Sequence, residues 1–348
     1  MKTALPLIAL LAFAAPCAHA AGGAPAGFAH YTARDLGSLG FRGVFVAAVN
    51  YLGQVVGQSE RPQNVDAPHA FATGPGIVGM IDLCPGESQS CAATGLNDAG
   101  LVTGWLESGG AFTVNVDGSG FTRLASNLDL NGVNASGRLV GEHLVASSGA
   151  TRAIVEGGVG LPPHDLGSLT GPDGHSQGNA INAAGAVVGC SNVASGAQHA
   201  FVMARLHGRM RDLGTLGGTN SCANAISDNG IVVGQSDTAG GATHAFFAAP
   251  ASHELVDMSS LGGHYTEADA VNAAGLAVGL SIVGNAFDTR AFVYDTGLRQ
   301  IADLNTLVDD LPAGVTLSEA TAINALGQIG AASDDGRAWL LTPVARRR

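Results

Sequence analysis

The stretch that decides the fold is DLGTLGGTNSCANAISDNGIVVGQSDTAGGATHAF, which runs from Asp212 to Phe246. Within it, Ser227 is followed by Gly three and seven positions later, and an aliphatic pair separates these two glycines. Copies of this feature, six of them with Asn in place of Ser, begin at Asn50, Asn97, Asn134, Asn182, Ser227, Asn272 and Asn324. The last copy has Ala331 in place of the second Gly, with Gly330 one position earlier. Successive copies lie 47, 37, 48, 45, 45 and 52 residues apart. The chain is therefore one supersecondary unit repeated seven times, with the length variation confined to loops.

Each repeat predicts four β-strands. An Ala or Gly followed by an aliphatic residue precedes every Asn, as in Ala225-Ile226, and this restriction indicates a strand packed where a longer side chain has no room. The Asn-x-x-Gly sequence predicts a hairpin turn, and the aliphatic pair predicts the second strand. The third strand begins with His-Ala-Phe or an Arg variant, as at His244, and the fourth ends in Asp-Leu or Asp-Met, as at Asp257. We interpret the repeated His and Asp side chains as structural hydrogen-bonding groups.

The two ends of the chain are complementary. The first unit begins with a fourth-strand signal at 33–39, and the last ends with a third-strand signal at 337–341. Pairing of these strands would close a ring and remove two exposed sheet edges. The prediction is an all-β, seven-bladed β-propeller closed by the N-terminal strand. The second unit lacks the third- and fourth-strand signals, and if it forms no blade, the alternative is a six-bladed propeller. An open β repeat array is a further alternative.

The leader and the composition predict export. Residues 1–20 combine Lys2, an apolar run and Ala18-His19-Ala20, which is typical of a secretory signal peptide. We assign 21–345 to a single propeller domain and 346–348 to a basic tail. No later apolar stretch has the length of a membrane span. The chain has a formal net charge of −12, so an acidic surface argues against nucleic acid as a partner. We expect an extracellular or periplasmic monomer.

Four cysteines remain after the leader, an even number for an oxidising compartment. We predict a disulfide between Cys84 and Cys91 across one loop, and a second between Cys190 and Cys222 in neighbouring units.

The stretch from Asp212 to Phe246, with His244-Ala245-Phe246 as its hallmark, resembles the HAF family of bacterial extracellular repeats. The resemblance covers nearly the whole chain after the leader and is strongest between Asp165 and Val293. It implies export and a repeat architecture. It implies no reaction, ligand or catalytic residue.

Three patterns that elsewhere indicate chemistry are interpreted here as structural. Gly174 to Gly178 matches the Gly-x-Ser-x-Gly nucleophile elbow, but an inner strand follows it where the elbow needs a helix. Gly74 to Gly79 matches a dinucleotide-binding loop, again with no helix after it. The repeated histidines are replaced by Arg in three units and would lie on separate blades. We therefore predict no catalytic constellation, metal or cofactor.

The connections leading into the inner strands carry the best candidates for ligand binding. These connections open on one face of a propeller, where a rigid scaffold presents variable loops. The candidate ligand-binding residues are Asp173, His175, His264, Tyr265, Glu267 and Glu319. Polar residues three positions before each Asn, as expected for the lining of a wet axial channel, are Thr94, Asn131, Asn179, Asn224, Asp269 and Thr321.

We therefore predict an exported binding or scaffold protein whose loops recognise an extracellular ligand, either a glycan or a protein. A first alternative is a secreted hydrolase or lyase that acts on glycans through Asp173, Glu267, Asp269 and Glu319. A second alternative is a passive surface or matrix component.

Overall fold

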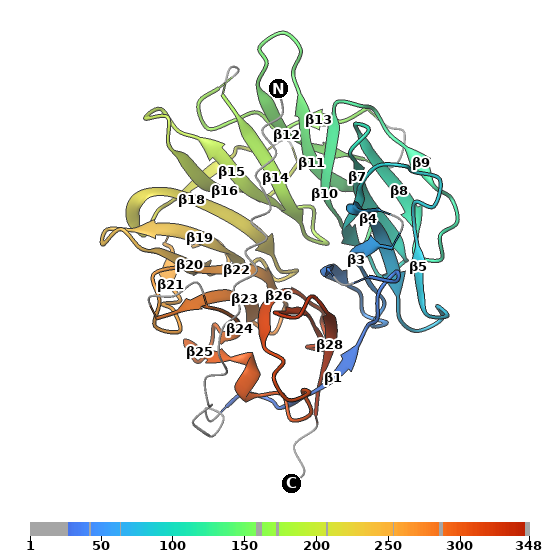
Figure 1. Ribbon diagram of the computed structural model, residues 1–348. Coiled ribbons are helices and arrows are strands. Elements are labelled where there is room, and N and C mark those ends of the chain that lie inside the picture. The colour runs from blue at the N-terminus through green and yellow to red at the C-terminus, as the bar shows by residue number, and fades with distance from the viewer. Residues whose placement is uncertain are drawn as a thin grey trace.

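The computed structural model describes residues 27–344 except 42, 63, 158–161, 172–173, 207, 253 and 285–287, and it confirms the seven-bladed propeller. Within these residues, each of seven antiparallel sheets has four strands, and the sheets stand in a ring (Figure 1). The proposed leader at 1–20 and the tail at 346–348 lie outside the described residues. No described helix is long and apolar enough to cross a membrane.

Strands are given for each blade in order from the axis outward. Blade 1 has β2 (Val44–Val49), β3 (Val55–Arg61), β4 (Asn64–Thr73) and β5 (Met80–Asp82). Blade 2 has β6 (Cys91–Leu96), β7 (Leu101–Leu106), β8 (Ala111–Asn115) and β9 (Thr122–Arg123). Blade 3 has β10 (Leu128–Val133), β11 (Leu139–Leu144), β12 (Thr151–Glu156) and β13 (His164–Asp165). Blade 4 has β14 (Ser176–Ile181), β15 (Val187–Asn192), β16 (Gln198–Met203) and β17 (Arg211–Gly214).

Blade 5 has β18 (Gly217–Ile226), β19 (Val232–Thr238), β20 (Thr243–Ala248) and β21 (Val256–Asp257). Blade 6 has β22 (Thr266–Val271), β23 (Leu276–Val283), β24 (Asp288–Asp295) and β25 (Gln300–Asp303). Blade 7 has β26 (Leu317–Ile323), β27 (Ile329–Ser333), β28 (Ala338–Pro343) and β1 (Tyr31–Asp35). A short 3-10 helix, η1 (Leu304–Thr306), follows β25.

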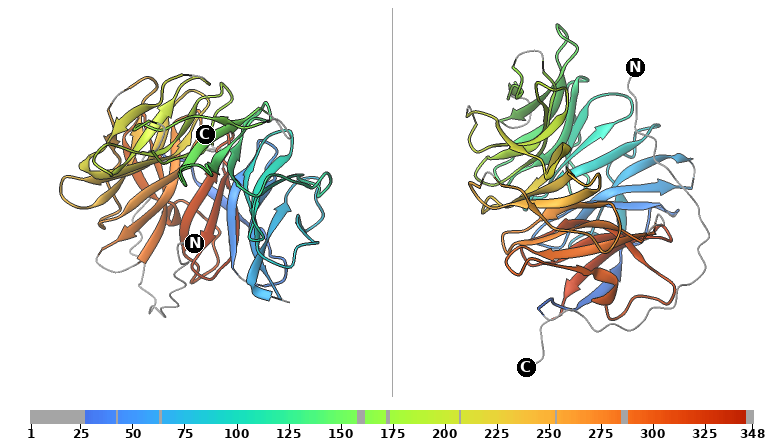
Figure 2. Two further views of the ribbon diagram at one scale, coloured as in Figure 1. Left: turned by 90° about the horizontal axis from the view of Figure 1, so that it is seen from above. Right: turned by 90° about the vertical axis from the view of Figure 1, so that its left-hand side faces the viewer.

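The ring is closed by strands from the two ends of the chain. Strand β1 pairs antiparallel with β28, so that Tyr31 faces Pro343 and Asp35 faces Trp339. In Figure 1 the blue β1 lies beside the red β28, and the two further views in Figure 2 also show blue and red strands side by side. The observed strand starts two residues earlier than the predicted 33–39 and ends at Asp35. The second repeat also forms a complete blade, so the six-bladed alternative was wrong.

Every inner strand carries a β-bulge three residues before the repeated Asn. The register shifts at this position in all seven sheets. Five of the bulged side chains donate a hydrogen bond to a backbone carbonyl of the next blade, and the donors are Thr94, Asn131, Asn179, Asn224 and Thr321. Asn131 Nδ2, for example, lies 2.9 Å from the Gly178 carbonyl oxygen. These side chains join blades, which corrects their predicted role as the lining of a wet channel. The two exceptions are Ala47 and Asp269.

The repeated Asn joins the blades a second time. In each hairpin its Oδ1 accepts backbone N–H bonds from the turn, as Asn50 does from Leu52 and Gln54. Its Nδ2 donates to the carbonyl of the equivalent residue in the next blade, and the donors are Asn50, Asn97, Asn134, Asn182, Asn272 and Asn324. Ser227 is too short for this contact. Asn229 supplies a substitute by donating to the Ala273 carbonyl oxygen at 2.9 Å.

The Ala-or-Gly position lies where blades approach most closely, as predicted. A Cβ placed on Gly95 would stand 2.9 Å from Gly132 Cα of the next blade. That distance leaves no room for a side chain at Gly95, whereas a Cβ on the equivalent Gly132 would meet its nearest neighbour, Val140 Cγ1, at 3.4 Å.

The His and Asp of the repeat pair with each other across the third and fourth strands. His199 Nδ1 lies 3.0 Å from Asp212, and the same carboxylate accepts the Gly214 N–H at 2.7 Å. The pairs His69–Asp82 and His244–Asp257 have the same arrangement. These contacts are the hydrogen bonds that the structural interpretation predicts. The structure also joins Cys84 to Cys91 and Cys190 to Cys222 as predicted.

Candidate ligand-binding site

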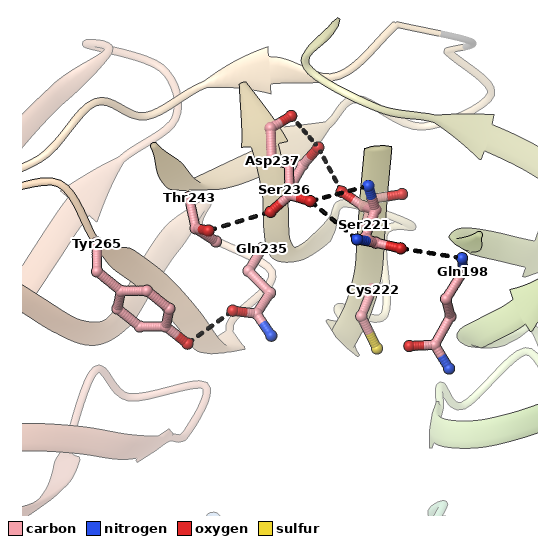
Figure 3. A pocket seen from close by; sticks show the side chains of 9 residues that line it. Gln198, Ser221, Cys222, Gln235, Ser236, Asp237, Thr243 and Tyr265 are labelled. Atoms are coloured by element: carbon pink, nitrogen blue, oxygen red, sulfur yellow. Dashed lines mark hydrogen bonds between the residues drawn. The ribbon is translucent and has the colours of Figure 1, made fainter. Parts of the chain in front are cut away.

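A cavity of about 240 Å³ opens where inner strand β18 begins, on the face predicted for recognition. Three blades contribute to it. Blade 4 supplies Gln198, blade 5 supplies β18, the end of β19 and Thr243, and the connection into blade 6 supplies Tyr265. Figure 3 shows these side chains around the opening. The lining residues are Gln198, Asn220, Ser221, Cys222, Gln235, Ser236, Asp237, Thr243 and Tyr265.

Hydrogen bonds fix one wall of the cavity. Asp237 accepts the backbone and side-chain N–H groups of Asn220, both at 3.0 Å, and the Thr243 hydroxyl at 3.1 Å. Asn220 Oδ1 in turn accepts the backbone N–H of Gln198 at 3.2 Å. This wall is therefore pre-organised, since its own hydrogen bonds hold these side chains in place.

Two amide side chains leave hydrogen-bonding groups available to a ligand. One polar atom of the Gln235 side-chain amide lies 2.7 Å from the Tyr265 hydroxyl, and the other has no hydrogen-bond partner among the described residues. The side-chain amide of Gln198 likewise has no partner in the described part of the chain, and this residue is exposed at the rim. None of the described residues lining the cavity is Lys or Arg. The free groups are thus neutral donors and acceptors.

Tyr265 links this cavity to a second polar group nearer the axis. Its hydroxyl lies 2.5 Å from Glu267 Oε2, and Asn224 donates to Glu267 Oε1 at 2.9 Å. Burial, and then the negative charge of Glu267, raise the pKa of Tyr265 above its ordinary value. The phenol therefore remains protonated at neutral pH and serves as a hydrogen-bond donor.

Three carboxyl groups meet beside Tyr265 on the adjacent inner strands β22 and β26. Glu267 and Asp269 come from β22, and Glu319 comes from β26. Burial first, then Glu267 and Glu319, raise the pKa of Asp269 well above its ordinary value. Burial, followed by Glu267, also raises the pKa of Glu319. Asp269 and Glu319 therefore favour the protonated form. Glu267 instead accepts hydrogen bonds from Tyr265 and Asn224.

Asp269 occupies a position where the repeat requires a donor. It is the bulged residue of blade 6, and the equivalent residues of blades 2, 3, 4, 5 and 7 all donate to the next blade. By the same register the carbonyl that Asp269 faces is that of Ala320. Its Oδ2 is buried and has no hydrogen-bond partner among the described residues. A carboxyl can donate here only when protonated, which agrees with the direction of its pKa shift.

The structure brings together some of the predicted site residues and separates others. Tyr265 and Glu267 share a hydrogen bond, and the charge of Glu267 contributes to the raised pKa of Glu319. His175 is exposed and its Nδ1 accepts the Thr151 N–H at 3.2 Å, while His264 is exposed in the turn before Tyr265. Asp173 lies outside the described residues.

Sequence reasoning missed Gln198, Asn220, Gln235 and Asp237. Gln198 begins β16, whereas Asn220, Gln235 and Asp237 lie within β18 and β19, and their polar side chains are indistinguishable in the sequence from those of an ordinary solvated strand. The one available signal was that the C-terminal end of β19 lies on the same face of the propeller as the connection that contains Tyr265. Ser176, the serine of the elbow-like pattern, accepts the Ala153 N–H and donates to the Gly167 carbonyl. Ser221 makes the equivalent two bonds, so the structural interpretation of this serine is confirmed.

No protein-family model matches the sequence, and no curated protein matches it. Solved structures do resemble it. The chain is similar to U3-55K at 10% identity, covering 92% of this chain and 100% of that one, with a TM-score of 0.57. It is similar to a prolyl endopeptidase at 11% identity, covering 92% of this chain and 51% of that one, with a TM-score of 0.53. It is also similar to TolB from Acinetobacter baumannii at 12% identity and a TM-score of 0.44, covering 67% of this chain and 59% of that one. The chain thus spans about half the length of the endopeptidase, and the likenesses to U3-55K and to the endopeptidase show the propeller fold alone.

Proposed function

We propose that this chain is an exported propeller that binds a small, uncharged, polyhydroxylated ligand, such as one sugar unit of an extracellular glycan. The observation that carries the proposal is the cavity between blades 4, 5 and 6. It combines a fixed polar wall, two amides with free hydrogen-bonding groups and the ring of Tyr265. The leader and the resemblance to HAF repeats support export.

The chemistry of the cavity favours hydroxyl groups over charged ligands. A hydroxyl donates and accepts, so it can satisfy both the Gln235 and Gln198 amides and the oxygens of Asp237. An anion would meet the Asp237 carboxylate with no Lys or Arg among the described lining residues to offset it. The cavity volume of about 240 Å³ lies below the roughly 300–1,000 Å³ typical of sites for drug-sized ligands. One small ring is therefore the expected occupant.

The test is thermal unfolding and calorimetry of the oxidised chain from Ala21 with a panel of neutral mono- and oligosaccharides. At 100 times its Kd, a ligand specific for the folded state adds about 2.7 kcal/mol to the free energy of unfolding. Gln235→Ala should weaken binding roughly tenfold, because it removes a ligand hydrogen bond worth about 1 kcal/mol or more. Gln58→Ala is the matched control, since Gln58 is the equivalent residue of blade 1 and does not line the cavity.

The proposal would be contradicted if both variants lost the ligand-induced rise in melting temperature equally. It would also be contradicted if no saccharide of the panel raised the melting temperature of the wild type. A flat response would favour the passive surface component or a protein partner.

A second candidate function is hydrolysis of the bound glycan. It is favoured by the carboxyl group beside Tyr265, because glycosidases need one carboxyl that holds a proton and one that stays ionised. Glu319 would act as the acid and Glu267 as its partner. The measurement is the release of new reducing ends from any glycan that binds. Glu267→Gln and Glu319→Gln should each abolish this release while retaining binding, and release that persists in both variants would rule these residues out.

A further inference from the structure

The junction of blades 1 and 2 places an imidazole beside two sulfurs in the core. A ring nitrogen of His69 and the Sγ atoms of Cys84 and Cys91 all lie within 4.8 Å of one another. All three residues are buried, and His69 has no exposed side-chain surface. Among the described residues, no other group of three or more His, Cys, Asp or Glu side chains meets this separation.

One nitrogen of the imidazole is held by a carboxylate, as in metal-ligating histidines. Its Nδ1 lies 2.8 Å from Asp82 Oδ2 and 3.0 Å from Oδ1, which leaves Nε2 as the nitrogen able to coordinate. Nε2 is buried and has no hydrogen-bond partner among the described residues. A carboxylate on the far nitrogen fixes the ring and raises its basicity, as in many zinc sites. Asp82 also accepts the backbone N–H of Cys84 at 2.9 Å, so one side chain positions two of the three groups.

The sulfurs distinguish this site from the other His–Asp pairs. His199 and His244 also face an Asp, but Gly214 and Ser221, or Ser259 and Thr266, occupy the places of the two cysteines. Their side chains are about one-fifth exposed, at 21% and 19%, whereas His69 is fully enclosed. The Ala70 N–H donates to Cys91 Sγ at 3.3 Å, and this bond would stabilise a thiolate.

We propose that His69, Cys84 and Cys91 form a redox-gated site for a soft d10 metal ion, Zn²⁺ or Cu⁺. In the oxidised chain the disulfide occupies both sulfurs. A dithiol reductant opens the site by two successive thiol–disulfide exchanges. One of its thiolates attacks a protein sulfur, and its second thiol then closes its own disulfide. The chain gains two electrons and two protons as Cys–SH groups. The metal binds the two thiolates and Nε2, and the two thiol protons are released to solvent.

The experiment reduces the full mature chain anaerobically with dithiothreitol and removes the reductant. Zn²⁺ and Cu⁺ are then added in separate samples at one equivalent. Alkylation of each cysteine is followed by peptide mass spectrometry. We expect at least one ion to slow alkylation of Cys84 and Cys91 about tenfold or more, and the ion that protects identifies the metal. Cys190 and Cys222 should react at the same rate with and without the ion, because no described metal-binding group includes them.

His69→Ala should weaken metal binding by at least about tenfold, as loss of even an outer-shell partner does in metal sites. His199→Ala, which breaks the equivalent pair of blade 4, should bind as the wild type does. Co²⁺ gives a second readout in the wild type, since thiolate coordination produces a charge-transfer band in the near ultraviolet. Equal alkylation with and without both ions, equal protection of all four cysteines, or wild-type binding by His69→Ala would each overturn the proposal. So would a reduced chain that unfolds and is not refolded by either ion.

Discussion

The side-chain amide of Asn324 donates a 2.9 Å hydrogen bond to the backbone carbonyl of Asn50, 274 residues away. This bond joins blade 7 to blade 1 near the axis, while pairing of β1 with β28 joins the two chain ends at the rim. The ring is therefore closed at two radii by different kinds of contact. The inner closure continues around the axis as the ring of Asn side chains, interrupted at Ser227.

Asn324→Ala should destabilise the fold by about 1–3 kcal/mol, because the buried Asn50 carbonyl then loses its side-chain donor. Ser227→Ala is the control, since Ser227 bonds only within its own hairpin. Urea unfolding of both variants measures the difference. Equal losses would mean that the hairpin bonds, and not the bond between blades, provide the stability.

Ser227→Asn should stabilise the chain by about 1 kcal/mol. The new Nδ2 would reach the Asn272 carbonyl by the geometry that the other six Asn side chains share, completing the ring. Ser227→Asp has nearly the same shape but no donor at neutral pH. A rise in melting temperature for Asn and none for Asp is the expected result, and equal behaviour of the two variants would contradict the donor argument.

Asp269→Asn should stabilise the chain at neutral and alkaline pH. Burial and two neighbouring carboxyls raise the folded-state pKa of Asp269 above its ordinary value of 3.8. Between these two values the folded chain holds a proton that the unfolded chain has lost. Wild-type stability from this group is therefore greatest below pH 3.8 and falls as the pH rises through the folded-state pKa. The Asn variant supplies a donor at every pH, and its advantage over the wild type should grow with pH.

Asp269→Ala separates the charge from the hydrogen bond. It should remove the same pH dependence but remain less stable than Asp269→Asn by about 1 kcal/mol, the worth of the bond between blades. Unfolding followed from pH 4 to pH 9 gives both quantities. A wild-type chain whose stability rises with pH relative to Asp269→Asn would show that Asp269 is ionised and stabilising.

Gly95→Ala should cost about 1–3 kcal/mol, because its Cβ would lie 2.9 Å from Gly132 Cα and 2.8 Å from Thr103 Oγ1. A backbone atom of the next blade cannot move without displacing that blade. Gly132→Ala is matched in position, and its nearest neighbour would be Val140 Cγ1 at an acceptable 3.4 Å. Thermal melts should separate the two variants by several degrees; similar melting temperatures would show that the blades adjust to the added methyl group.

The sequence by itself determined the seven blades, their closure by the chain ends and both disulfides. These features are set by turns and strand periods, which are local, and by a spacing that repeats about every 45 residues. It also indicated Tyr265, Glu267 and Glu319, because they lie in or near connections that must open on one face.

Only the tertiary structure decided which side chains share a cavity. Gln198, Asn220 and Tyr265 come from three successive blades, and their meeting depends on loop lengths and on the twist between sheets. The bulge at Asp269 was equally invisible in the sequence, because a two-residue period gives no sign of where one extra residue enters a strand. The bulge turns each such side chain toward the next blade, and only that contact shows that an acid stands where the ring requires a donor.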